Sequence, residues 1–189
     1  RLGDLTEKRY LREAVLRLLP KVELHTHLDG SIRVEHILEM AERQGVNLRN
    51  AIPELPVGYG LEDIRRFAVL GEEAVGEDFE QFLIQRFALP LAVLQTQSGL
   101  ELAAYYLVEQ AYEDGVAHLE ARFAPVIHQR RHLHYHEIVD AVYRGLKRGG
   151  ERFGVSTALI LCCYRNLESV FPGHLEHTAE AAIDAARRY

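Results

Sequence analysis

The chain has few cysteines and no long apolar run, and each shortage excludes a class of protein. Among 189 residues there are 2 cysteines, Cys162 and Cys163. They are adjacent in a predicted strand, so their side chains project to opposite faces and are poorly placed to pair. This usage fits a reducing compartment, and we expect a cytoplasmic protein. No apolar run approaches the ~20 residues that a membrane-spanning helix needs, so we expect no membrane partner.

The charge pattern argues against a protein that binds nucleic acid. The formal net charge is −6 and the pI is about 5.9, with Lys and Arg scattered along the chain. A protein that binds a phosphate backbone typically clusters these residues. No glycine-rich phosphate-binding motif follows a predicted strand, and the Pro-Cys-x-x-Cys motif of cytidine-deaminase zinc sites is absent. Residues 1–4 lack the apolar core of a signal peptide.

The most informative stretch is 20–31, which reads Pro-Lys-Val-Glu-Leu-His-Thr-His-Leu-Asp-Gly-Ser. In a strand, its alternation would place on one face Glu23, His25, His27 and Asp29, and on the other face Val22, Leu24, Thr26 and Leu28. Two imidazoles two residues apart can bind one divalent ion, and imidazole suits zinc. Paired histidines also occur on surfaces and in hydrogen-bonded interiors. We hypothesise a metal site at His25 and His27, because an acidic face surrounds them.

Hydrophobic periodicity predicts strands separated by helices. We expect strands over 21–28, 116–124 and 155–163, and helices over 6–19, 34–44, 61–75, 78–89, 98–115, 135–148 and 175–188. Ser98 and Glu101 have the spacing of a capping box, and Gly149-Gly150 is expected to end the helix that begins near Tyr135. The absence of hairpin signals favours parallel pairing in βαβ units.

An open doubly wound sheet and a (β/α)8 barrel both fit this order, and polar faces on two strands favour the barrel. On the second strand His118, Glu120 and Arg122 share a face, and we expect Glu120 and Arg122 to form a structural charge network. The apolar run 155–163 is typical of a strand that is buried on both faces. Residues 46–60 read as a loop.

The remaining histidines and cysteines have plain structural interpretations. His132, His134 and His136 lie at a predicted loop-to-helix junction, where solvated polar residues are expected. We expect His128 and His174 in loops or at the surface. Cys162 and Cys163 are interpreted as small buried apolar groups.

Four ordered blocks resemble the adenosine deaminase branch of the metal-dependent amidohydrolases. They are 20–31, 86–96 (RFALPLAVLQT), 115–125 (GVAHLEARFAP) and 159–165 (LILCCYR). The resemblance implies an α/β fold of the (β/α)8 TIM-barrel type, of which only the first three β/α units are present, as one incomplete domain over 1–189. Residues 46–97 would be a helical and loop insertion over the active-site mouth. The implied reaction is hydrolytic deamination of adenosine and 2′-deoxyadenosine to inosine and ammonia by a Zn²⁺-activated water.

The resemblance also implies roles for individual residues. His25 and His27 match the first two zinc ligands, and His27 would also lie against the bound purine nucleoside. Asp29 matches the carboxylate that binds the ribose 5′-hydroxyl, and relatives that act on free adenine look more like Glu here, so Asp favours a nucleoside. The predicted helix that carries Phe82 and Phe87 resembles the apolar gate over the pocket.

The family's third histidine ligand, its general-acid glutamate and its catalytic histidine are expected beyond Tyr189. The catalytic residues are therefore unknown within the chain, and 1–189 alone is expected to be inactive. Unpaired strand edges would favour its self-association. Two alternatives stay open: a deaminase of another adenine-containing compound, and a truncated non-catalytic barrel that serves as a binding or assembly module.

Overall fold

Three parallel strands form a single sheet in a computed structural model that describes residues 12, 15–16, 18–68, 87–164 and 172–189. The strands are β1 (Lys21–His27), β2 (Val116–Phe123) and β3 (Ser156–Leu161), and they pair in the order β1-β2-β3. The predicted strands and their parallel pairing are confirmed. Each strand is followed by at least one helix, as in the βα units of a barrel.

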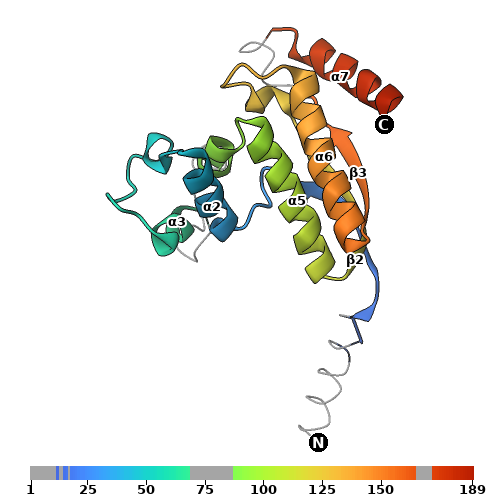
Figure 1. Cartoon of the computed structure of the whole chain (residues 1–189), viewed down its shortest axis with the longest axis horizontal. Helices are drawn as coiled ribbons and strands as arrows, with labels where there is room; N and C mark the ends of the chain where they lie inside the picture. Colours follow the sequence, from blue (N-terminus) through green and yellow to red (C-terminus); the bar gives the residue numbers. More distant parts are fainter. Residues whose placement is uncertain (1–11, 13–14, 17, 69–86, 165–171) are drawn as a thin grey trace, which may run out of the picture.

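The helices α5 (Gln97–Glu113) and α6 (Tyr135–Phe153) cover one face of this sheet, and α2 (Val34–Gln44) and α3 (Leu61–Ala68) lie to one side of them (Figure 1). The other bounds are α7 His174–Arg188 and the short 3-10 helices η1 Leu48–Asn50 and η3 Pro125–His128. Residues 87–93 are also helical. Figure 1 shows α5 and α6 side by side in front of the sheet. Most of the predicted helix 6–19, the end of 61–75 and most of 78–89 lie outside the described residues.

None of the described helices combines the length and the apolar character that crossing a membrane requires.

The start of α5 differs from the predicted capping box. The N-cap is Thr96, whose Oγ1 accepts a hydrogen bond from the Gly99 N–H at 3.0 Å. Ser98 lies inside the first turn, so its hydroxyl is not the cap. The prediction placed the helix start correctly to within one residue and chose the wrong capping side chain.

Gly149-Gly150 does not end α6, which continues to Phe153 and ends at Gly154 with a φ of 72°. A Cβ on Gly145 would lie 2.1 Å from the Glu101 carbonyl oxygen, and one on Gly149 would lie 2.7 Å from the Val108 Cβ. Glycine therefore lets α6 approach α5 more closely than any side chain would allow. The prediction was wrong because these glycines serve helix packing.

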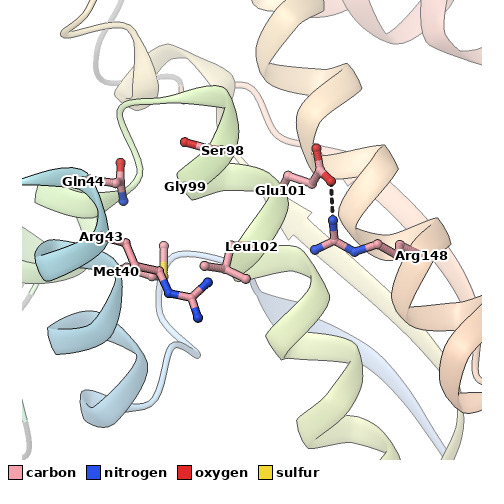
Figure 2. Close-up of a pocket in the computed structure, with 8 residues that line it drawn as sticks. All are labelled: Met40, Arg43, Gln44, Ser98, Gly99, Glu101, Leu102 and Arg148. Atoms are coloured by element: carbon pink, nitrogen blue, oxygen red, sulfur yellow. Dashed lines mark hydrogen bonds and ion pairs between the residues drawn. The ribbon is translucent and has the colours of Figure 1, made fainter.

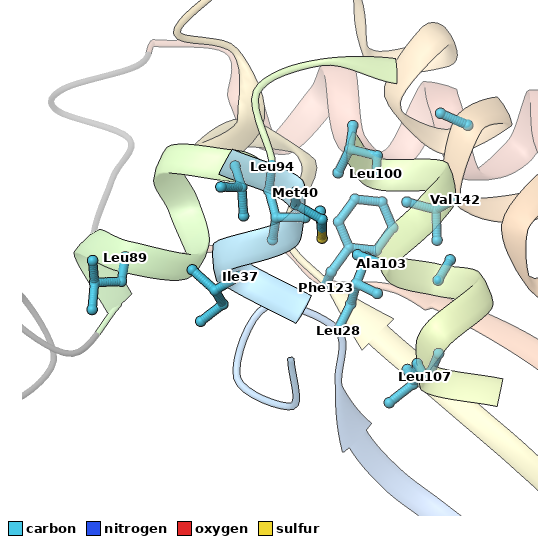
Figure 3. Close-up of a cluster of buried hydrophobic side chains, with 14 of the residues drawn as sticks. Leu28, Ile37, Met40, Leu89, Leu94, Leu100, Ala103, Leu107, Phe123 and Val142 are labelled. Atoms are coloured by element: carbon cyan, nitrogen blue, oxygen red, sulfur yellow. The ribbon is translucent and has the colours of Figure 1, made fainter. Parts of the chain in front are cut away.

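The core lies between the sheet and α2, α5 and α6. On β2 the side chains of Leu119, Ala121 and Phe123 are fully buried. Figure 3 shows Phe123 among core side chains that include Met40 of α2 and Leu100 of α5. The alternation predicted for the second strand is confirmed, since its apolar face is the buried one.

The outer strands are less covered than β2. Val22 and Leu24 of β1 are 61% and 54% exposed. The residues of β3 are half-buried or exposed, where burial on both faces was predicted, because β2 is its one paired neighbour in the described chain. Just after β3, Cys162 is half-buried and Cys163 is exposed, which corrects their interpretation as buried apolar groups.

Candidate functional site

A cavity of about 590 Å³ opens at the carboxyl ends of all three strands. β1 contributes its last residue His27, β2 contributes its last residue Phe123, and Cys162 and Tyr164 follow β3. The full lining is His27, Asp29, Asn50, Ala51, Phe87, Ala88, Leu91, Phe123, Ala124, Ile127, Arg130, Cys162 and Tyr164. In β/α barrels the catalytic groups lie at this end of the strands, so this cavity is the candidate active site.

His25 and His27 lie together at the end of β1. Their ring centroids are 5.4 Å apart with an interplanar angle of 30°, and both residues are exposed. The pairing of β1 with β2 shifts register between Glu23 and Thr26, and the Glu23 carboxylate accepts a hydrogen bond from the His25 N–H at 2.8 Å. Such irregularities re-aim side chains next to sites. The strand thus presents two neighbouring imidazoles, one of which lines the cavity.

Asp29 is buried at the cavity wall, with an exposed fraction of 4%. Its Oδ1 has no hydrogen-bond partner among the described residues. Burial raises the pKa of this carboxyl above its ordinary value, while the neighbouring His27 and the backbone N–H groups of Asp29 and Gly30 oppose the rise. A buried acceptor without a partner is costly, so the site is suited to a ligand that donates a hydrogen bond there.

The rest of the wall is largely apolar. Phe87 and Leu91 come from the helical residues 87–93, and Ile127 comes from η3. A Cβ added to Gly30 would lie 3.6 Å from Cζ of Phe87, so the Phe87 ring covers the turn that follows His27. Phe87, at the end of the segment that resembles the apolar gate, lines the cavity, while Phe82 falls outside the described residues.

Beneath this wall His128 is fully buried, which corrects its expected loop or surface position. Its Nδ1 lies 3.1 Å from the Leu94 carbonyl oxygen, and its ring packs 5.6 Å from that of Phe123. Burial lowers the pKa of His128 to about 4, so the imidazole is neutral near pH 7. His174 is also buried, at the start of α7, and its predicted surface position was wrong for the same reason: tertiary packing covers it.

Glu120 and Arg122 were expected to form a charge network, but they do not pair with each other. Glu120 Oε1 lies 3.7 Å from Nε2 of His118, and the Arg122 guanidinium donates to the Leu24 carbonyl oxygen at 2.6 Å. That carbonyl lies in the stretch of β1 where the register shifts. Arg122 thus supports the irregular backbone of the histidine strand.

His132, His134 and His136 are exposed, as expected. The rings of His134 and His136 stack with centroids 5.6 Å apart. Across the described part of the chain, no group of three or more His, Cys, Asp or Glu residues is arranged to hold a metal ion. His25 and His27 together provide two imidazole nitrogens, which fit part of a zinc ligand set.

A second hollow, of about 370 Å³, lies between α2 and the α5–α6 pair (Figure 2). Arg148 there is ion-paired with Glu101, and Arg43 is paired with Glu39. Its charged groups already have protein partners, and it lies away from the strand ends. The cavity at the strand ends is the stronger candidate site.

A parallel sheet with helices after its strands and a cavity at the strand ends is the arrangement of an α/β barrel, and solved amidohydrolases share this fold. An amidohydrolase from Burkholderia ambifaria with bound Zn is 25% identical and matches 78% of this chain and 36% of its own, with a TM-score of 0.59. An adenine deaminase from Arthrobacter aurescens is 32% identical and matches 75% of this chain and 39% of its own, also with a TM-score of 0.59. The chain thus contains three β/α units of a TIM-type barrel.

The family follows from the sequence comparisons. The adenosine deaminase family model matches residues 20–187, and the chain belongs to this family. Adenosine deaminases of Enterococcus faecalis and Clostridium perfringens are 40% and 35% identical over 156 and 155 residues, or 82% and 81% of this chain. The chain spans 43% of the length of each of these relatives. The expected membership in the family is confirmed.

Several cavity residues were not identified from the sequence. Ala124 directly follows β2, and Tyr164 lies three residues after the end of β3, so the rule that barrel sites lie at the carboxyl ends of strands could have found them. Asn50 is the last residue of the 3-10 helix η1, Arg130 lies in the turn after η3, and their sequence carries no comparable signal. Only the fold brings these two segments to the cavity.

Proposed function

We propose that the full-length protein hydrolyses the 6-amino group of adenosine and 2′-deoxyadenosine to give inosine or 2′-deoxyinosine and ammonia. The observation that carries the proposal is the position of Asp29, whose buried Oδ1 lacks a partner among the described residues in a cavity that His27 also lines. A ribose hydroxyl is the donor that this acceptor would bind. The relatives described above support the choice of adenosine.

The chain's own residues would bind and orient the nucleoside. Asp29 would accept a hydrogen bond from the 5′-hydroxyl, and the wall of Phe87, Leu91 and Ile127 would pack against the base and exclude water. We also propose that residues 46–97 form part of the mouth, because residues at both ends of this segment line the cavity. The group that protonates the purine is assigned to sequence beyond this chain.

We propose zinc as the cofactor, with His25 and His27 as two of its ligands. The chemistry that zinc supplies when bound is a water of lowered pKa. Support comes from the two neighbouring imidazoles at the strand end and from the Zn-bound relative. Other ligands must come from outside the described residues.

Zinc analysis tests this ligand assignment. In the full-length protein we expect His25→Ala and His27→Ala each to lower zinc content and deaminase activity together, because each removes one ligand. His132→Asn is the control, since His132 is exposed, does not line the cavity and has a φ of 60° that asparagine also adopts. Unchanged zinc content in either test variant would show that the ligands are elsewhere.

The 5′-hydroxyl contact is tested with two substrates and one variant. We expect the wild-type protein to prefer adenosine over 5′-deoxyadenosine by roughly ten- to a hundredfold in kcat/KM, the range for a hydrogen bond to a charged group. Asp29→Ala should abolish the preference by lowering kcat/KM for adenosine alone. A preference that persists in Asp29→Ala would show that another group binds the hydroxyl.

Free adenine is the second candidate substrate, since the solved adenine deaminase resembles this chain. Turnover of adenine by the full-length protein, followed by ultraviolet absorbance alongside adenosine, separates the two. A protein that is inert on adenosine and active on adenine would overturn the proposed substrate. Inertness on both would favour a non-catalytic binding module.

A further inference from the structure

A single buried amide joins the two segments that form the apolar wall of the cavity. Gln95, which is 4% exposed, follows the helical residues 87–93. Its Nε2 donates to the carbonyl oxygens of Leu91 at 2.9 Å and Ile127 at 3.1 Å, and its Oε1 accepts from the Arg130 N–H at 2.9 Å. Both amide protons and the amide oxygen are therefore engaged with backbone groups.

All three partners of Gln95 belong to residues that line the cavity, whereas Gln95 itself does not. Leu91 comes from one side of the wall, and Ile127 and Arg130 come from the other. We propose that Gln95 is a positioning residue, which holds Leu91 and Ile127 at the separation that lets the apolar wall grip a purine base. The proposal rests on the proposed function of the cavity.

A second glutamine, Gln44, binds residues on either side of Gln95 and offers a matched comparison. Gln44, the last residue of α2, donates from Nε2 to the Val93 carbonyl oxygen at 2.9 Å and accepts from Thr96 Oγ1 at 2.6 Å. Figure 2 shows Gln44 close to Gly99, where α5 begins. Neither Val93 nor Thr96 lines the cavity. Gln44 therefore anchors residues 93–96 to α2, without linking the two sides of the wall.

Replacing Gln95 with methionine keeps the length of the side chain and removes its hydrogen bonds. The Ile127 carbonyl oxygen and the Arg130 N–H then lose the Gln95 partner, the Leu91 carbonyl oxygen keeps only the Leu94 N–H, and the two segments relax relative to each other. Contacts with the base are made in the ground state and in the transition state alike, so their loss raises KM more than it lowers kcat. His25 and His27 are untouched, and zinc binding should not change.

The experiment compares wild type, Gln95→Met and Gln44→Met in the full-length protein, at a temperature where circular dichroism shows all three folded. We expect Gln95→Met to raise KM for adenosine about tenfold, equivalent to ~1.4 kcal/mol, with little change in kcat. Gln44→Met should lower Tm to a similar extent and leave KM unchanged. Zinc content should be equal in all three proteins. If Gln95→Met does not fold, Gln95→Asn serves instead, because it keeps a neutral amide in this buried position and is one methylene shorter, so it cannot reach all three partners.

An unchanged KM in Gln95→Met, or an equal rise in Gln44→Met, would overturn the positioning role and leave both glutamines as ordinary stabilising groups. Failure of the proposed function has a different signature, which is a wild-type protein without turnover of adenosine. If the wild-type protein has no turnover, the role of Gln95 is tested by the affinity of each variant for purine riboside, measured by calorimetry. A weaker affinity in Gln95→Met than in Gln44→Met supports the role, and equal affinities overturn it.

Discussion

β1 and β2 carry the same alternation of polar and apolar side chains, yet their apolar faces have different fates. On β2 the side chains of Leu119 and Phe123 are fully buried under α5 and α6, whereas Val22 and Leu24 of β1 are largely exposed. Alternation therefore predicts which side chains share a face of a strand. It does not predict whether another element covers that face.

The candidate site combines residues from the exposed strand β1 with residues near the buried strand β2. The proposed metal ligands His25 and His27 stand on the exposed strand, whose register shift is supported by Arg122. In the proposed base-binding wall, Ile127 follows the buried strand β2, Phe87 and Leu91 come from the helical residues 87–93, and Phe123 packs against the buried His128 beside them. We infer that substitutions beneath the wall act mainly through folding stability, and that substitutions on β1 act mainly through metal binding.

The largest expected effect tests the contrast in burial directly. Phe123→Ala should lower the free energy of unfolding by about 3–5 kcal/mol, because it leaves a cavity in the core. Leu24→Ala should change it by less than about 0.5 kcal/mol, because the side chain is exposed. Urea denaturation measures both. A large loss in Leu24→Ala would show that β1 is covered by another segment or by a second copy, and the contrast would fail.

A second effect concerns the pH dependence of stability beneath the wall. The pKa of His128 falls from an ordinary value of 6.5 to about 4 on folding, so the unfolded chain binds a proton between these pH values and the folded chain does not. Stability from this group is complete above pH 6.5 and is lost as the pH falls towards 4, in total about 3 kcal/mol. Urea denaturation at several pH values measures the slope.

His128→Asn sharpens this test, because asparagine can still donate to the Leu94 carbonyl and cannot titrate. The variant should be less dependent on pH than wild type between pH 6.5 and 4. His132→Asn is the control, since His132 is exposed and tolerates a positive φ of 60° that asparagine also adopts. Equal slopes in wild type and His128→Asn would show that other groups set the acid sensitivity.

Features that depend on neighbouring residues could be predicted from the sequence, and features that depend on contacts between distant residues could not. The strands, their parallel order and the neighbouring positions of His25 and His27 follow from local patterns, and residues 20–31 carry a recognisable motif. The burial of His128, by contrast, follows from packing against residues distant in sequence. The bonds of Gln95 to Ile127 and Arg130 likewise have no local signature.

The smallest expected effect concerns the glycines of α6 that face α5, among which is Gly145. Gly145→Ala should lower the free energy of unfolding by about 1–3 kcal/mol, because its Cβ would meet the Glu101 carbonyl oxygen and force α6 away from α5. Gly60→Ala is the matched control, since a Cβ there meets no described atom within 4 Å, and its effect should be less than about 0.5 kcal/mol. Thermal denaturation of both variants measures the difference. Equal effects would mean that α6 can move away from α5 without a loss of stability. Close packing of α5 and α6 would then not explain the burial of the apolar face of β2.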